Sequence, residues 1–188
     1  MRYIVRTVAG LRREGCDYLR ERLPVEFQVD ERRDIIANFE AAFRRQGTDD
    51  AVHMEDDVLL TLAFEAKLQA AIEPWRDQLV QMFTCRPKAD RAGSRWAPGR
   101  DFVHAQCFYV PGADAPRLAE FYAGWTGRPG YDAQACADLG VSDYLIANRR
   151  RYRIVVPSLV QHEGNGSLVG HGAFMDRWRS PSFVDAWA

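Results

Sequence analysis

Two periodicities of apolar residues alternate along the first third of the chain. Three short runs rich in β-branched or alternating apolar residues have the period of a strand, and two longer segments have helical spacing. In the second of these segments, Ile35, Phe39 and Phe43 fall on one helical face. The expected strands are 3–10, 25–29 and 51–54, and the expected helices are 11–23 and 32–46. This alternation predicts a doubly wound α/β fold with a parallel sheet.

The remainder of the chain continues the mixture of strands and helices without an internal repeat or a linker between domains. We expect strands at 78–84, 102–110 and 152–157 and helices at 60–75, 113–125 and 138–150. Residues 86–101 are rich in Arg, Gly and Pro and have no periodicity, so they predict a mobile basic loop. The sequence therefore predicts a single domain.

Composition narrows the class of protein. The 188 residues carry 25 Lys and Arg against 26 Asp and Glu, a formal net charge of −1, so no global field attracts nucleic acid or a membrane surface. No apolar run approaches the ~20 residues that span a bilayer, and the N-terminus has no signal-peptide pattern. The four cysteines form no C-x-x-C pair, which argues against structural zinc and a disulfide framework. We expect a cytoplasmic protein, or one in the host cytoplasm if it is viral.

An acidic triplet, Glu55, Asp56 and Asp57, directly follows the third expected strand. Adjacent carboxylates repel one another unless a cation lies among them. Ligands of open α/β sheets bind outside the carboxyl ends of strands, and the i, i+2 spacing points Glu55 and Asp57 to the same side. The triplet is therefore a candidate site for a hard divalent cation. The alternative is a solvated loop in which Asp57 caps the following helix.

A second polar segment follows the last expected strand. His162 comes shortly after Pro157, and Gly164 and Gly166 allow a tight backbone there. Glycines and small polar residues fit a loop that closes over phosphates. The alternative for His162 is a hydrogen-bonded structural residue.

Together, the two segments resemble those of a nucleotide-sugar glycosyltransferase of the GT-A fold. The stretch VHMEDDVLL resembles the acidic DxD-type motif of that fold, and PSLVQHEGNGS resembles its late PSLxQHxGxxS segment, found also in phage-encoded members. The resemblance implies a Rossmann-like, mixed, mostly parallel sheet flanked by helices. It implies that Asp57, with Glu55 or Asp56 and with His162, holds Mn²⁺ or Mg²⁺ against the diphosphate of a donor, which we expect to be a UDP-sugar.

The resemblance also assigns the other site residues. It places Thr7 and Val8 near the nucleotide base and Arg12 or Arg13 near phosphate. Residues 1–60 would form the nucleotide-sugar-binding half and residues 102–170 the acceptor half. An inverting member needs a carboxylate base, and Asp138 in CADLGVSDYL stands near the family's position, although Ala137 replaces the Glu of that motif. Asp143 and Asp132 are the fallback bases, a plain helix N-cap is the alternative for Asp138, and a retaining mechanism would need no such base.

The acceptor and two competing functions stay open. Trp96 within the basic run 86–100, and a second basic run at Arg149–Arg153, combine cations with aromatic rings, which suits phosphate contacts and base stacking. A hydroxymethylated pyrimidine in phage DNA is one candidate acceptor; the second run is otherwise a charged helix end. The competing functions are a metal-dependent phosphoesterase or nuclease and a non-catalytic nucleic-acid-binding module.

Overall fold

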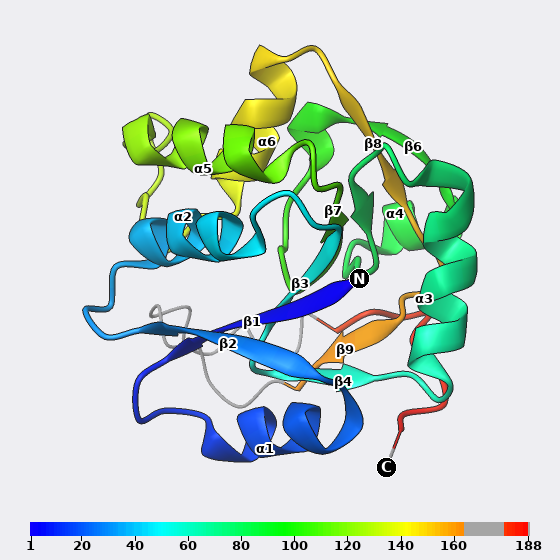
Figure 1. Cartoon of the computed structure of the whole chain (residues 1–188). Coiled ribbons are helices and arrows are strands. Elements are labelled where there is room, and N and C mark those ends of the chain that lie inside the picture. The colour runs from blue at the N-terminus through cyan, green and yellow to red at the C-terminus, as the bar shows by residue number, and fades with distance from the viewer. Residues whose placement is uncertain (164–178, 188) are drawn as a thin grey trace.

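A computed structural model describes residues 1–163 and 179–187 of the chain (Figure 1). Its centre is a seven-stranded sheet in the order β2-β1-β3-β7-β5-β8-β6. The strands are β1 (Arg2–Val8), β2 (Val25–Asp30), β3 (Ala51–Glu55), β5 (Val80–Gln81), β6 (Arg95–Pro98), β7 (Cys107–Val110) and β8 (Arg151–Ile154).

The strand directions make the sheet mixed but mostly parallel. Strand β1 is parallel to β2 and β3, and β8 is parallel to β5. Strand β7 is antiparallel to both β3 and β5, and β6 is antiparallel to β8. Strands β1, β2, β3, β5 and β8 therefore share one direction, which confirms the sheet type expected from the sequence.

Helices cover both faces of this sheet (Figure 1). Leu19 and Leu68 pack one core cluster beneath β1 and β3, and Phe43, Leu118 and Val141 pack another cluster on the opposite face. Helices α1 and α3 thus lie on one side and α2, α5 and α6 on the other. The helices are α1 (Arg13–Arg22), α2 (Ile35–Gln46), α3 (Phe64–Ile72), α4 (Pro87–Arg91), α5 (Ala115–Gly124) and α6 (Leu139–Ala147), with short 3₁₀ turns η1 (Glu73–Trp75) and η2 (Gly99–Asp101).

A separate two-stranded sheet lies on the α1 side. Strand β4 (Val58–Leu60) pairs antiparallel with β9 (Val160–His162), and Ala186 bridges Thr61 beside them. The side chain of Trp187 packs against the same core cluster. The helix expected at 60–75 therefore begins only at Phe64, because the residues before it pair as a strand with a distant segment.

Beyond residue 75, several elements also differ from those expected from the sequence. The strands expected at 78–84 and 102–110 contract to β5 and β7, and the helix expected at 138–150 ends at Ala147. The prediction of an irregular loop at 86–101 is wrong, because this segment contains α4, β6 and η2. Strand β6 pairs with β8 at the end of the sheet, and of the basic residues of this segment Arg95 lies in that edge strand while the others lie in or beside α4 and η2.

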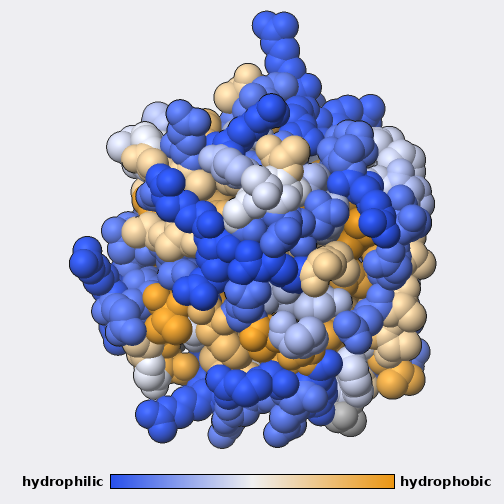
Figure 2. All heavy atoms as spheres, in the orientation of Figure 1, coloured by the Kyte–Doolittle hydropathy of each residue, from blue (hydrophilic) through white to orange (hydrophobic). Residues whose placement is uncertain are grey.

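The face shown in Figure 2 is mainly hydrophilic, with hydrophobic atoms between polar ones. Among the described residues, no helix combines the length and apolarity that crossing a bilayer requires. The cytoplasmic location stays a prediction. All four cysteines are free, and Cys107 is fully buried in the sheet.

Candidate metal and ligand site

The predicted site residues meet at the carboxyl edge of β1 and β3. Glu55 ends β3, Asp57 lies in the turn that follows it, and His162 ends β9. The β4–β9 pairing sets Val58 opposite His162, and the backbone N–H of Glu163 donates to the Asp57 carbonyl at 2.8 Å. This register brings the late histidine to the early acids, although they are far apart in the sequence.

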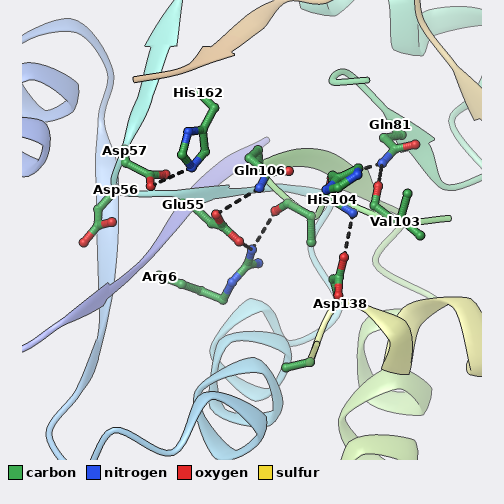
Figure 3. A network of polar contacts seen from close by, with 12 residues as sticks. Arg6, Glu55, Asp56, Asp57, Gln81, Val103, His104, Gln106, Asp138 and His162 are labelled. Atoms are coloured by element: carbon green, nitrogen blue, oxygen red, sulfur yellow. Dashed lines mark hydrogen bonds and ion pairs between the residues drawn. The ribbon is translucent and has the colours of Figure 1, made fainter. Parts of the chain in front are cut away.

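Glu55, Asp57 and His162 together form a group that could hold a metal ion. Their ligand atoms all lie within 4.8 Å of one another, and His162 Nε2 is 3.1 Å from Asp57 Oδ2 (Figure 3). Among the described residues, Asp57 Oδ1 is buried and has no hydrogen-bond partner. A cation would satisfy that orphaned acceptor. Two carboxylates and one imidazole fit Mn²⁺ better than Mg²⁺, which prefers an all-oxygen shell.

The middle acid of the triplet has a different environment. Asp56 Oδ2 accepts a hydrogen bond from Thr7 Oγ1 at 2.5 Å, and Asp56 Oδ1 lies 3.2 Å from Arg12 Nη1. Figure 3 shows the Asp56 carboxylate pointing away from Glu55 and His162. The alternation expected from the i, i+2 spacing is therefore present, and it leaves Asp56 outside the candidate metal group.

Arg12 joins the acidic turn to helix α1. Its guanidinium forms ion pairs with both Asp56 and Asp57, and only 14 % of its side chain is exposed. The helix reaches the turn because residue 15 is glycine: a Cβ there would lie 1.9 Å from the Asp56 carbonyl oxygen. The resemblance implied that Arg12 or Arg13 lies near phosphate, and the structure places the positive charge of Arg12 at the acidic end of the site.

The carboxylates and the imidazole change one another's protonation. Burial raises the pKa of Glu55 to about 7, and the charge of Asp57 adds to that rise. Because 31 % of the Glu55 side chain is exposed, solvent screens part of the interaction. Burial alone would raise the pKa of Asp57, but the hydrogen bond and charge of His162 and the charge of Arg12 lower it. Burial alone would lower the pKa of His162, but Asp57 and Glu55 raise it.

A pocket of about 310 Å³ opens beside this group. The ends of β1 and β3 form one wall, through Val8 and the acids, and Asn38 and Phe39 of α2 line another. Asp138, directly before α6, lines the same pocket, as does Arg86 from the basic segment. The predicted nucleotide-binding residues and the predicted base thus border one common cavity.

The structure separates the three candidate bases. The buried Asp138 carboxylate accepts a hydrogen bond from the His104 backbone N–H at 2.6 Å, and it makes no capping bond to α6. Burial raises its pKa, against the opposing effect of that hydrogen bond. Asp143 is instead bound by Arg128 at 2.5 Å and by Trp125 Nε1 at 3.0 Å, and it does not line the pocket. Asp132 accepts from the backbone N–H groups of Gln134 and Ala135.

Three polar residues of the pocket were missed by the sequence reading. Arg6 lies in the middle of β1 with 5 % of its surface exposed, and Gln106 and Asn38 are also buried. Arg6 Nη2 lies 3.7 Å from Glu55 Oε1 and donates to the Ala105 carbonyl at 2.7 Å. The sequence feature that could have indicated Arg6 is its position inside the apolar run YIVRTV. A buried strand tolerates a charged side chain only when the charge has a partner.

The last two predictions from the sequence concern the second basic run, Arg149–Arg153, and the late glycines, Gly164 and Gly166. The run Arg149–Arg153 begins before β8 and includes its first three residues. Because β8 shares its direction with β3, the run begins toward the edge of the sheet opposite the acids. Arg153 lies over the ring of Trp75 at 5.0 Å and Arg151 over that of Trp96 at 6.0 Å. Gly164 and Gly166, expected in a phosphate-closing loop, lie outside the described residues.

Comparison with known proteins supports the fold and leaves the activity open. No protein-family model matches the chain, and no curated protein is significantly similar to it. The crystal structure of A197 from STIV is similar, with a TM-score of 0.51 and 13 % sequence identity, and the match covers 86 % of this chain and 84 % of A197. At that identity the similarity concerns the arrangement of strands and helices alone.

Proposed function

We propose that this protein is a metal-dependent glycosyltransferase that moves a sugar from a UDP-sugar to a hydroxyl acceptor. The observation that carries the proposal is the convergence of Glu55, Asp57 and His162. They come from the two segments that resemble glycosyltransferase motifs, and their ligand atoms lie within 4.8 Å of one another beside a pocket of about 310 Å³. If these acids were only solvated surface groups, Asp57 Oδ1 would not be buried without a hydrogen-bond partner among the described residues.

Different residues around the pocket would carry out different parts of the transfer reaction. Held by Glu55, Asp57 and His162, Mn²⁺ would supply a Lewis acid that offsets the negative charge of the diphosphate. Thr7 and Val8 border the pocket where the nucleotide would lie, and Arg12 brings positive charge to the same end. Asp138 removes the proton of the acceptor hydroxyl as that oxygen bonds to the sugar and the bond from sugar to diphosphate breaks, which leaves UDP. Its raised pKa strengthens it as a base.

The competing functions have less support. A two-metal phosphoesterase or nuclease needs a second ligand set, and the described residues contain one group of three candidate ligands. A nucleic-acid-binding module would rest on the basic runs, of which Arg149–Arg153 lies away from the pocket. Arg86 does line the pocket. A hydroxymethylated DNA base as acceptor stays a prediction.

Thermal denaturation with nucleotides and metal tests the proposal. We expect UDP with Mn²⁺ to raise the melting temperature by several degrees, because a ligand that binds only the folded state stabilises it. UDP without Mn²⁺, and ADP or GDP with it, should have little effect. Asp57→Ala should abolish the shift and also UDP-sugar hydrolysis and transfer.

The matched control is Asp17→Ala, which removes an exposed carboxylate of α1 whose partner is Arg20. This variant should retain the nucleotide shift and the turnover of the wild type. Wild-type turnover in Asp57→Ala would refute the proposal. Phosphodiester cleavage without sugar transfer would point instead to the phosphoesterase.

A further inference from the structure

Besides Asp57 Oδ1 in the candidate metal group, three more buried polar atoms in the wall of the pocket have no hydrogen-bond partner among the described residues. They are Arg6 Nη1, Asn38 Oδ1 and Gln106 Oε1, and all three residues line the same cavity. Leaving a buried donor or acceptor unpaired destabilises the folded state, because the group loses its hydrogen bonds to water. Folded proteins usually satisfy such atoms with a ligand, an ordered water or an ion, so a group of them in one pocket wall marks a polar binding surface.

Two of these side chains, Arg6 and Gln106, are held in place through their other atoms. Arg6 donates to the Ala105 carbonyl and lies over the ring of Phe39, with its Cζ 4.0 Å from the ring centroid. Gln106 Nε2 donates to Glu55 Oε2 at 3.4 Å. The contacts on one side of Arg6 and Gln106 fix their orientation, so the unpaired atoms are available to a ligand without reorganisation.

The three atoms match the chemistry of a neutral polyhydroxyl ligand. One is a donor and two are acceptors, and each sugar hydroxyl both donates and accepts. An anionic group is disfavoured here, because the carboxylates of Glu55 and Asp138 both act electrostatically on Arg6. The ring of Phe39 adds an apolar surface to the same wall.

We infer that Arg6, Asn38 and Gln106 form the subsite for the transferred sugar of the donor, a neutral hexose. This inference rests on the proposed function. Arg6 and Gln106 both approach Glu55, whereas Thr7, Arg12 and Asp56 interact among themselves beside α1. The candidate metal group therefore lies between a nucleotide end and a sugar end of the site.

Calorimetric titration in saturating Mn²⁺ tests the subsite through the difference between UDP and UDP-sugars. The probes are UDP, UDP-glucose, UDP-galactose, UDP-N-acetylglucosamine and UDP-glucuronate. We expect at least one neutral UDP-hexose to bind the wild type tenfold or more tightly than UDP does, and UDP-glucuronate to gain nothing over UDP. Asn38→Ala should lose that gain and retain the affinity for UDP.

Thermal stability separates this role from a structural one. Removing an unsatisfied buried atom should leave the melting temperature of Asn38→Ala without ligands unchanged or higher, whereas a structural asparagine would lower it. Asn148→Ala is the control, since the Asn148 amide donates to the Tyr144 carbonyl at the end of α6. It should keep the sugar-dependent gain. If Asn38→Ala fails to fold, Arg6→Lys, which keeps the charge and loses the planar fork, should lose the gain in its place.

The outcomes distinguish a failure of the sugar subsite from a failure of the proposed function. Equal affinity of the wild type for UDP and for every UDP-hexose overturns the subsite and leaves the proposed function standing. A full gain in both Asn38→Ala and Arg6→Lys, or a preference for UDP-glucuronate, also overturns the subsite. Failure of UDP and of every UDP-sugar to bind overturns the proposed function and the subsite together.

Discussion

At the scale of single residues, three consecutive acids have three different sets of partners. Asp57 faces His162 and Arg12, Asp56 turns to Thr7, and Glu55 lies between Asp57 and Arg6. The alternation of side chains along an extended backbone explains why the first and third acids share a side. Their different burial and neighbours then move their pKa values in opposite directions.

Metal affinity should depend steeply on pH because of these shifts. Ligands must lose their protons before a metal binds. The pKa of Glu55 is raised to about 7, and that of His162 is raised from 6.5, so both groups hold protons near and below neutral pH in the metal-free protein. We expect the Kd for Mn²⁺ to fall at least tenfold from pH 6 to pH 8, with proton release. Calorimetry in buffers of different ionisation enthalpy measures both, and a Kd independent of pH would contradict the ligand assignment.

Two aspartates near α6 should differ in their contribution to catalysis. Asp138→Asn keeps an oxygen that can accept from the His104 backbone N–H but removes the base, so transfer should fall by about 10²–10⁴-fold. Binding of UDP with Mn²⁺ should be retained. Asp143→Asn breaks the ion pair with Arg128 away from the pocket, and it should keep activity while losing about 1 kcal/mol of stability. Steady-state kinetics and chemical denaturation of both variants check this pair, and equal losses of activity would remove Asp138 from its role.

At the scale of elements, helix α1 and strand β9 bring the site together. Helix α1 delivers Arg12 to the acidic turn, and this approach depends on the absence of a side chain at Gly15. Strand β9 delivers His162 by pairing with β4. Neither contact is local in sequence, so the metal group is sensitive to changes in α1 and β4, which contribute none of its three candidate ligands.

Two helical glycines provide a direct test of that dependence. A Cβ at Gly15 would lie 1.9 Å from the Asp56 carbonyl oxygen, so Gly15→Ala should destabilise the protein by roughly 1–3 kcal/mol and weaken Mn²⁺ binding. A Cβ at Gly124, the last residue of α5, meets nothing within 4 Å. Gly124→Ala should therefore stabilise by about 0.5–1 kcal/mol and leave Mn²⁺ binding unchanged. Urea denaturation and metal titration compare them, and wild-type metal affinity in Gly15→Ala would show that the approach of α1 is dispensable.

At the scale of the whole molecule, the last described segment helps to hold the small sheet of β4 and β9. The backbone N–H of Trp187 donates to the Leu60 carbonyl at 2.7 Å, and that of Leu62 donates to the Asp185 carbonyl at 2.6 Å. Tyr18 of α1 donates to the Trp187 carbonyl and accepts from the Leu60 N–H. Residues from both ends of the sequence thus support the strand pair that positions His162.

Loss of the Trp187 side chain should weaken this support. Its ring packs against the core cluster on the α1 side, so Trp187→Ala should lower the free energy of unfolding by roughly 2 kcal/mol. We expect weaker Mn²⁺ binding as well, because β4 and β9 loosen together. Exposed Tyr131→Ala is a control for removing an aromatic side chain and should change stability little. An unchanged melting temperature in Trp187→Ala would contradict this account.

The sequence by itself determined the alternation of strands and helices in the first half, the place of the acids after β3 and the pairing of the first and third acids on one side. Local periodicity and backbone geometry decide these features. The tertiary structure decided the rest. It placed Leu60 of an expected helix in β4, and it put an edge strand, β6, within the expected basic loop, because pairing with distant segments overrides local propensity. It also placed Asp138 in the pocket, kept Asp143 out, and revealed Arg6, Asn38 and Gln106 as buried and unsatisfied, which depends on burial and neighbours that no local pattern encodes.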